Sequence, residues 1–87
     1  MNTLATDTEP RASSARCTDD ELVVHLADGR TLAVPLAWFP RLLSASAADR
    51  NDVVLIGEGE GLHWPKMDED VSVAGLLAGR SAIRAAK

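Results

Sequence analysis

Residues 21–36 read ELVVHLADGRTLAVPL, and this stretch decides the fold. Aliphatic side chains alternate with other side chains on both sides of Asp28-Gly29, which is typical of a β-hairpin. A two-residue turn would put the two aliphatic sets on opposite faces, because a shift of one residue reverses every side chain. A three-residue loop, Ala27–Gly29 with Gly29 in the left-handed conformation, puts them on one face. The predicted cross-strand pairs are therefore Leu22–Val34 and Val24–Leu32, with His25 on the opposite face.

The residues after the hairpin predict two helices and a further strand. Pro40 suits the first turn of a helix that runs to about Arg50, where Asn51 supplies a stop. The apolar run Val53–Ile56 is too short for a helix and is predicted to be a buried strand. A second helix is expected to begin at Ser72, a suitable N-cap, and to end at Gly79. We predict a small α+β fold, in which an antiparallel, hairpin-based sheet of about three to four strands is packed on one side by two short helices.

The length of 87 residues allows one domain. Residues 1–15 are mostly small and polar, so we expect a flexible leader there. Residues 16–79 form the predicted domain. Residues 80–87 form a basic C-terminal tail that is helical or frayed.

Charge and cysteine content limit the possible partners. Nine basic against thirteen acidic side chains give a net charge of −4, which counts against unaided binding to nucleic acid or to an anionic membrane. No apolar run approaches the roughly 20 residues that span a bilayer. The single cysteine, Cys17, excludes an internal disulfide and favours a cytoplasmic setting.

The residues that could carry chemistry are few. A nucleophilic triad needs a reactive Ser or Cys, a His and an orienting acid, and neither His25 nor His63 has such partners in the sequence pattern. The alternating glycines of residues 57–61 lack the lysine of a phosphate-binding loop. We therefore predict no enzymatic activity, no cofactor and no metal.

An alternative for His63 is a metal site shared with Asp68, Glu69 and Asp70, but their spacing matches no zinc or EF-hand motif. These acids precede a predicted helix, so capping its positive end is the favoured interpretation.

The three aromatic residues, Trp38, Phe39 and Trp64, all lie beside a proline. Large rings held by stiff neighbours serve as rigid anchors, either in a small core or in the pocket of a partner. Packing in the core is the more frequent outcome in so short a chain.

Four ordered motifs resemble a bacterial family, domain of unknown function 2442. They are LADGR (26–30), VPLAWFPRL (34–42), GLHWPKMDEDVSV (61–73) and GLLAG (75–79). The resemblance covers roughly residues 16–79 and implies a compact α+β domain without established catalytic residues. It also implies members that occur alone, fused to a helix-turn-helix domain, or beside a small partner gene as in toxin–antitoxin pairs. No helix-turn-helix pattern of adequate length is present in this sequence, so DNA binding by the chain itself is not expected.

The leading hypothesis is a non-enzymatic interaction module, an antitoxin-like partner of another small protein that is toxin-like or binds nucleic acid. A small core that benefits from association also allows a homodimer. Residues 58–70 contain five acidic side chains and one lysine, so this segment carries the whole net charge. The alternative hypothesis is an acidic inhibitor that occupies the basic nucleic-acid-binding groove of a larger machine, as phage-type anti-defence (anti-CRISPR-like) proteins do. The candidate interaction residues are Trp38, Glu58, Glu60, His63, Trp64, Asp68, Glu69 and Asp70.

Overall fold

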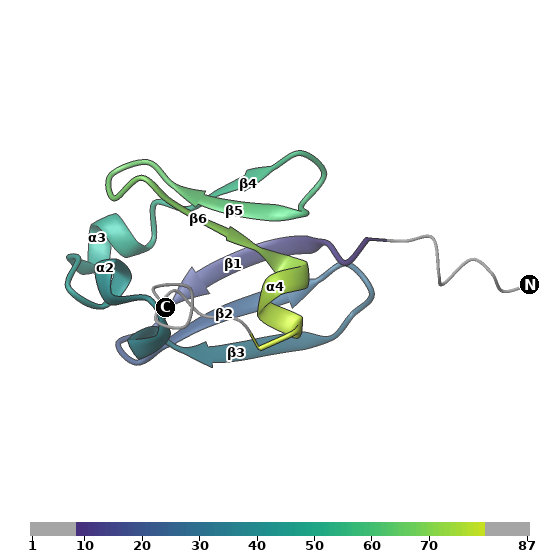
Figure 1. Cartoon of the computed structure of the whole chain (residues 1–87), viewed down its shortest axis with the longest axis horizontal. Helices are drawn as coiled ribbons and strands as arrows, with labels where there is room; N and C mark the ends of the chain where they lie inside the picture. The colour runs from purple at the N-terminus through teal and green to yellow at the C-terminus, as the bar shows by residue number, and fades with distance from the viewer. Residues whose placement is uncertain (1–8, 80–87) are drawn as a thin grey trace, which may run out of the picture.

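The predicted hairpin forms two strands of the first sheet. In a computed structural model of the chain, which describes residues 9–79, the antiparallel strands β1 (Ala12–Cys17), β2 (Glu21–Leu26) and β3 (Thr31–Pro35) lie in the order β1-β2-β3 (Figure 1). The cross-strand pairs Leu22–Val34 and Val24–Leu32 are those predicted. Gly29 has a φ of 99°, and the Leu26 N–H donates to the Arg30 carbonyl at 2.8 Å, which confirms a three-residue loop.

β1 lies partly inside the segment that the sequence assigned to a flexible leader, so the predicted boundary at residue 15 is wrong. It pairs with β2 from Ala12, opposite Leu26, to Cys17, opposite Leu22, with a bulge between Ala12 and Ser14. Its inward residues are buried but small, and for this reason its sequence lacks the apolar alternation of a half-buried strand. Residues 1–8 and the predicted tail, 80–87, lie outside the described residues.

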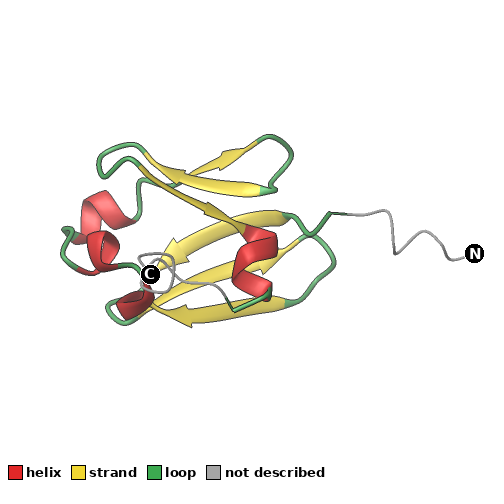
Figure 2. Cartoon of the chain, viewed as in Figure 1, coloured by secondary structure: helices red, strands yellow, loops and turns green. Residues whose placement is uncertain are grey.

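The α+β class and the hairpin-based antiparallel sheet are confirmed, and a second antiparallel sheet, which the sequence did not predict, accompanies the first. It contains β4 (Val54–Ile56), β5 (Gly61–Trp64) and β6 (Glu69–Ser72) in the order β4-β5-β6 (Figure 2). Residues 62–64 were expected in a loop and Glu69 and Asp70 before a helix, but these segments are the strands β5 and β6. Strands of four residues show too little alternation to be recognised between turn-forming residues.

The helices are shorter than predicted. Along the chain, the segment between β3 and β4 contains a 3-10 helix, η1 (Leu36–Trp38), and two α-helices, α2 (Pro40–Leu43) and α3 (Ala47–Arg50). The two α-helices take the place of the single helix expected from residue 40 to 50. The interruption occurs where the Ser44 hydroxyl donates to the Pro40 carbonyl at 2.8 Å, and Ser46 then caps α3 by accepting the Asp49 N–H. Pro40 in the first turn and the stop at Asn51 are confirmed.

The last helix, α4 (Val73–Leu77), begins as the sequence predicts. Ser72 is its N-cap, and the Ser72 Oγ accepts the Gly75 N–H at 2.8 Å. Its first turn contains no acidic residue, so the predicted capping role of Asp68, Glu69 and Asp70 is wrong.

One buried cluster holds both sheets and the helices together. The two sheets lie one above the other, with α2 and α3 at one end and α4 beside the first sheet (Figure 1). The largest fully buried side chains are Trp64, Leu22, Leu36, Leu42, Leu62, Val24 and Val73. β4 contributes none of them, although its apolar run was predicted to be a buried strand.

Candidate functional site

β4 exposes large aliphatic side chains at the edge of the second sheet. Val54, Leu55 and Ile56 are 47%, 38% and 44% exposed, and among the strands of residues 9–79 β4 pairs with β5 alone. The run is a strand, as predicted, but it is not buried. The neighbouring strand β5 explains why β4 stays exposed. Leu62 and Trp64 of β5 already fill the core beneath the second sheet.

The cross-strand register divides these side chains between two faces. Leu55 lies opposite the buried Leu62, whereas Val54 lies opposite His63 and Ile56 opposite Gly61. Since opposite residues of an antiparallel pair point to the same face, Val54 and Ile56 lie on the outer face. The outer face of the second sheet thus combines two rows, Val54–His63–Asp70 and Ile56–Gly61–Ser72.

His63 and Asp70 form a cross-strand pair on this outer face. The His63 Nδ1 lies 2.6 Å from the Asp70 Oδ1, and the Asp70 side chain is 68% exposed. Such a carboxylate fixes the orientation of the imidazole ring. Ser72, the hydroxyl of the neighbouring row, is occupied as the cap of α4. Within residues 9–79 no third His, Cys, Asp or Glu joins the pair in a metal-binding group.

The acidic residues are divided between the two ends of β5. Glu58 and Glu60 belong to the β4–β5 turn, whereas residues 68–70 lie at or after the β5–β6 turn. The Glu58 Oε1 lies 3.2 Å from the Arg11 Nη1, and the Glu69 Oε1 lies 3.7 Å from the Arg41 Nη1. The acidic side chains of residues 58–70 therefore do not form one patch in space. They form two smaller groups, each next to an arginine.

The two tryptophans differ in accessibility. Trp64 is fully buried, and its indole Nε1–H donates to the Arg50 carbonyl at 2.7 Å. Trp64 is thus a core residue and cannot line a docking surface, which corrects its place among the candidate interaction residues. Trp38 is half-buried against the core and meets Phe39 edge-to-face, with ring centroids 6.5 Å apart.

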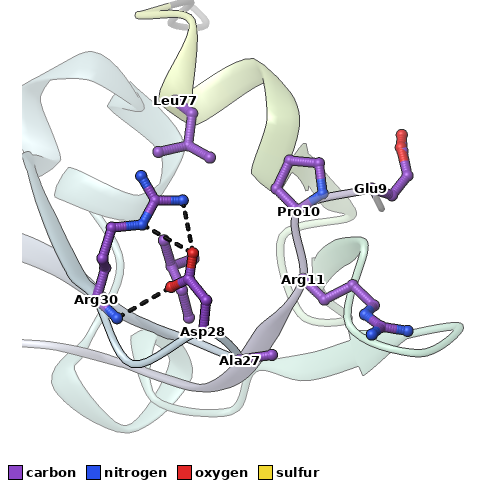
Figure 3. A pocket seen from close by; sticks show the side chains of 8 residues that line it. Glu9, Pro10, Arg11, Ala27, Asp28, Arg30 and Leu77 are labelled. Atoms are coloured by element: carbon purple, nitrogen blue, oxygen red, sulfur yellow. Dashed lines mark hydrogen bonds and ion pairs between the residues drawn. The ribbon is translucent and has the colours of Figure 1, made fainter. Parts of the chain in front are cut away.

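A pocket of about 450 Å³ opens beside the tip of the first hairpin (Figure 3). Two of its charged groups pair with each other, since the Arg30 Nε donates to the Asp28 Oδ2 at 2.9 Å, and a third, Arg11, pairs with Glu58 outside the pocket. The Arg30 backbone N–H, assisted by its guanidinium, holds the pKa of Asp28 below its usual value. The lining residues are Glu9, Pro10, Arg11, Leu26, Ala27, Asp28, Arg30 and Leu77.

A second pocket, of about 320 Å³, adjoins the acids of the β5–β6 turn. Arg41 occupies its wall and donates from Nη1 to the Met67 and Asp68 carbonyls at 3.1 and 3.2 Å. Both pockets are built around internal ion pairs, whereas β4 offers three large aliphatic side chains that stay 38% to 47% exposed in the described fold. We therefore take β4 and its flanking residues as the candidate site.

Sequence reasoning did not include Val54, Leu55 and Ile56 among the candidate residues. The available signal was their acidic flanks, Asp52 and Glu58, because charges beside an apolar strand commonly guard an exposed edge. Of the helices in residues 9–79, none has the length and apolar character that a bilayer span requires.

Together these features define a small α+β domain with an open second sheet. The chain belongs to the family described as "Protein of unknown function (DUF2442)", whose model matches residues 12–82. It is also similar to a protein of unknown function from Rhodospirillum rubrum, known from a crystal structure at 2.75 Å. The two are 38% identical with a TM-score of 0.76, and the match covers 85% of this chain and 92% of the other. No curated protein matches the chain.

Proposed function

We propose that this protein is a non-enzymatic interaction module that binds another small protein through β4. One observation carries the proposal: three adjacent aliphatic residues of an edge strand are exposed by 38% to 47%. Complete burial of such a side chain contributes roughly 1.5–3 kcal/mol, so covering each of these half-exposed residues contributes roughly 1 kcal/mol. Val54 and Ile56 lie on the outer face and Leu55 on the inner one, so the apolar surface lies along both faces of the open edge, and exposed apolar surface of this kind is typical of an interaction site.

We place this role in the cytoplasm and regard it as antitoxin-like, in the sense that the protein holds a second small protein in a complex. The support is the single cysteine, which suits a reducing compartment, and the small core, which gains from association. The His63–Asp70 pair, in one row with Val54, borders this surface in the proposal as a lesser contributor. Trp38 of η1 stays a separate candidate contact.

The alternative, an acidic inhibitor that occupies a basic nucleic-acid-binding groove, has weaker support. It needs a continuous acidic surface, whereas the carboxylates are divided between two turns, and Glu58, Glu69 and Asp70 already lie beside Arg11, Arg41 and His63, respectively. It predicts salt-sensitive binding that charge reversal of Glu58, Glu60 and Glu69 abolishes.

Affinity capture with matched variants tests the leading proposal. The tagged full chain is compared with Val54→Lys and Ile56→Lys, which place a charge on the apolar edge, and with Leu43→Lys. Leu43 is a suitable control because it is an aliphatic residue of α2 with 48% exposure, close to that of Val54. Thermal unfolding checks that every variant is folded.

We expect one protein that the unmodified chain and Leu43→Lys retain and that both β4 variants lose. Equal retention by Ile56→Lys, or no protein retained specifically by the unmodified chain, would contradict the proposal.

A further inference from the structure

We propose that β4 receives an extended segment of its partner as an additional strand, and that this segment carries Lys or Arg on both sides of a short apolar core. The inference rests on the proposed function and names the mode of binding and the chemistry of the partner. Three observations carry it. β4 is an unpaired sheet edge among the described strands, acidic residues flank it at both ends, and these acids would repel one another if a second copy of the chain paired with it.

β4 is the sheet edge best suited to accept a strand. On its side away from β5, no strand of residues 9–79 pairs with its backbone, so N–H and C=O groups are presented to the outside. An incoming strand would satisfy these groups and cover the adjacent aliphatic side chains at the same time.

The other edges are less suited. In β1 the outward N–H groups of Ala12 and Cys17 already donate to the Gly59 carbonyl at 2.7 Å and to the Asn51 Oδ1 at 2.9 Å. β3 ends in Pro35, which has no N–H to donate. β6 begins with two charged residues, Glu69 and Asp70.

Acidic residues flank β4 at both ends. Asp52 lies two residues before Val54, and Glu58 lies two residues after Ile56, and both are exposed. The Arg11–Glu58 pair competes only weakly for Glu58, because the two side chains are 37% and 77% exposed and exposed ion pairs contribute little. A strand laid along β4 therefore has an acidic residue near each end, whether it runs parallel or antiparallel. Basic residues at both ends of that strand are favoured.

The same charges disfavour a second copy of this chain as the occupant. Antiparallel pairing of two β4 strands about Leu55 places Val54 of one copy opposite Ile56 of the other, which aligns the aliphatic residues. This register also brings Asp52 of one copy to the same end as Glu58 of the other, and the two-fold axis repeats the repulsion at the opposite end. The flanking acids thus select against self-association while leaving the edge open to a basic segment.

Titration of the full-length, nitrogen-15-labelled protein with defined peptides tests the inference by nuclear magnetic resonance. The probes are Lys-Lys-Val-Ile-Val-Lys-Lys, the same core with Glu in place of every Lys, and the lysine peptide with two consecutive core amides N-methylated. We expect the lysine peptide to shift the amides of residues 53–57 and to bind about tenfold more tightly than the glutamate peptide at low salt. This preference shrinks at about 0.5 M salt, where charges are screened beyond a few ångströms. N-methylation removes strand pairing and should abolish the shifts.

Two double variants, each of which removes two negative charges, test whether the acids that flank β4 cause the preference for the lysine peptide. Asp52→Asn with Glu58→Gln should remove the preference for the lysine peptide, whereas Asp19→Asn with Asp20→Asn should keep it, because these exposed acids lie in the β1–β2 turn.

Equal affinity for both peptides, an undiminished effect of the N-methylated peptide, shifts confined to another surface, or no shifts at all would overturn the inference. So would a dimer in sedimentation that Ile56→Lys dissolves, because the edge would then be occupied by a second copy. If the capture experiment succeeds while these peptide results fail, the interaction function stands and only the mode and partner chemistry are wrong.

Discussion

Trp64 connects three elements at the helical end of the molecule. Its indole in β5 donates to the carbonyl of Arg50 in α3, and the Arg50 Nε and Nη2 donate to the Leu42 and Leu43 carbonyls at the end of α2 at 2.9 and 3.0 Å. These bonds give additional donors to carbonyl groups at the ends of two short helices. Trp64 is therefore a core residue, the more frequent outcome expected from the sequence, although it was also named as a candidate contact for a partner.

Cys17 provides a prediction on pH at the scale of one residue. Burial raises the pKa of its thiol above the usual value, against the opposing effect of the Arg50 charge. The folded state thus holds the thiol proton more tightly than the unfolded state does. The thiol contributes to stability below the unfolded pKa, and this contribution is lost as the pH rises through the folded pKa.

We expect the free energy of unfolding to fall more between pH 7 and pH 10 in the unmodified chain than in Cys17→Ala. Urea denaturation of both proteins at the two pH values measures this difference. The loss of packing in Cys17→Ala is the same at both pH values, so it cancels when the fall in unfolding free energy is compared. An equal fall in both proteins would show that the thiol has the same pKa in the folded and unfolded states.

At the scale of elements, the close approach between the two sheets depends on Gly59. The Gly59 carbonyl accepts the Ala12 N–H at 2.7 Å, and a Cβ on Gly59 would lie 2.2 Å from the Ala12 carbonyl oxygen. Gly29 has a similar positive φ of 99°, against 103° at Gly59, but no atom lies within 4 Å of the position of its Cβ. Comparing an alanine substitution at Gly29 with one at Gly59 therefore separates the cost of backbone strain from the cost of steric contact.

We expect Gly29→Ala to lower the free energy of unfolding by about 1–2 kcal/mol through strain alone. Gly59→Ala should cost roughly 1–3 kcal/mol more, because its methyl group meets backbone that cannot move aside easily. Chemical denaturation of the two variants and the parent measures both. Equal losses would mean that the β4–β5 turn does not fit closely against β1.

The first hairpin could be predicted in detail because its information is local. Alternation of aliphatic residues, Gly29 and the parity of the loop together determine its register, and Ser72 determines the start of α4 in the same way. β1 and β5 could not be predicted, since their strand conformation depends on partners distant in sequence. The exposure of β4 was missed because an apolar run has the same composition in a core as on an open edge.

At the scale of the whole molecule, the first sheet and the helices enclose the core, and the second sheet leaves one edge and its outer face open. The candidate residues from the sequence are distributed accordingly. Trp64 lies inside, the acidic residues lie at two separate turns, and His63 and Asp70 share the outer face with Val54 and Ile56 of β4. The central claim is that the open edge is where a partner binds.

Hydrogen–deuterium exchange of the full chain, free and in complex with the protein captured in the variant experiment, tests this claim most directly. We expect the amides of residues 53–57 that point away from β5 to exchange rapidly in the free protein and to become protected in the complex. Protection of the hairpin tip at residues 27–30 or of the β5–β6 turn at residues 65–68, with no change in β4, would contradict it.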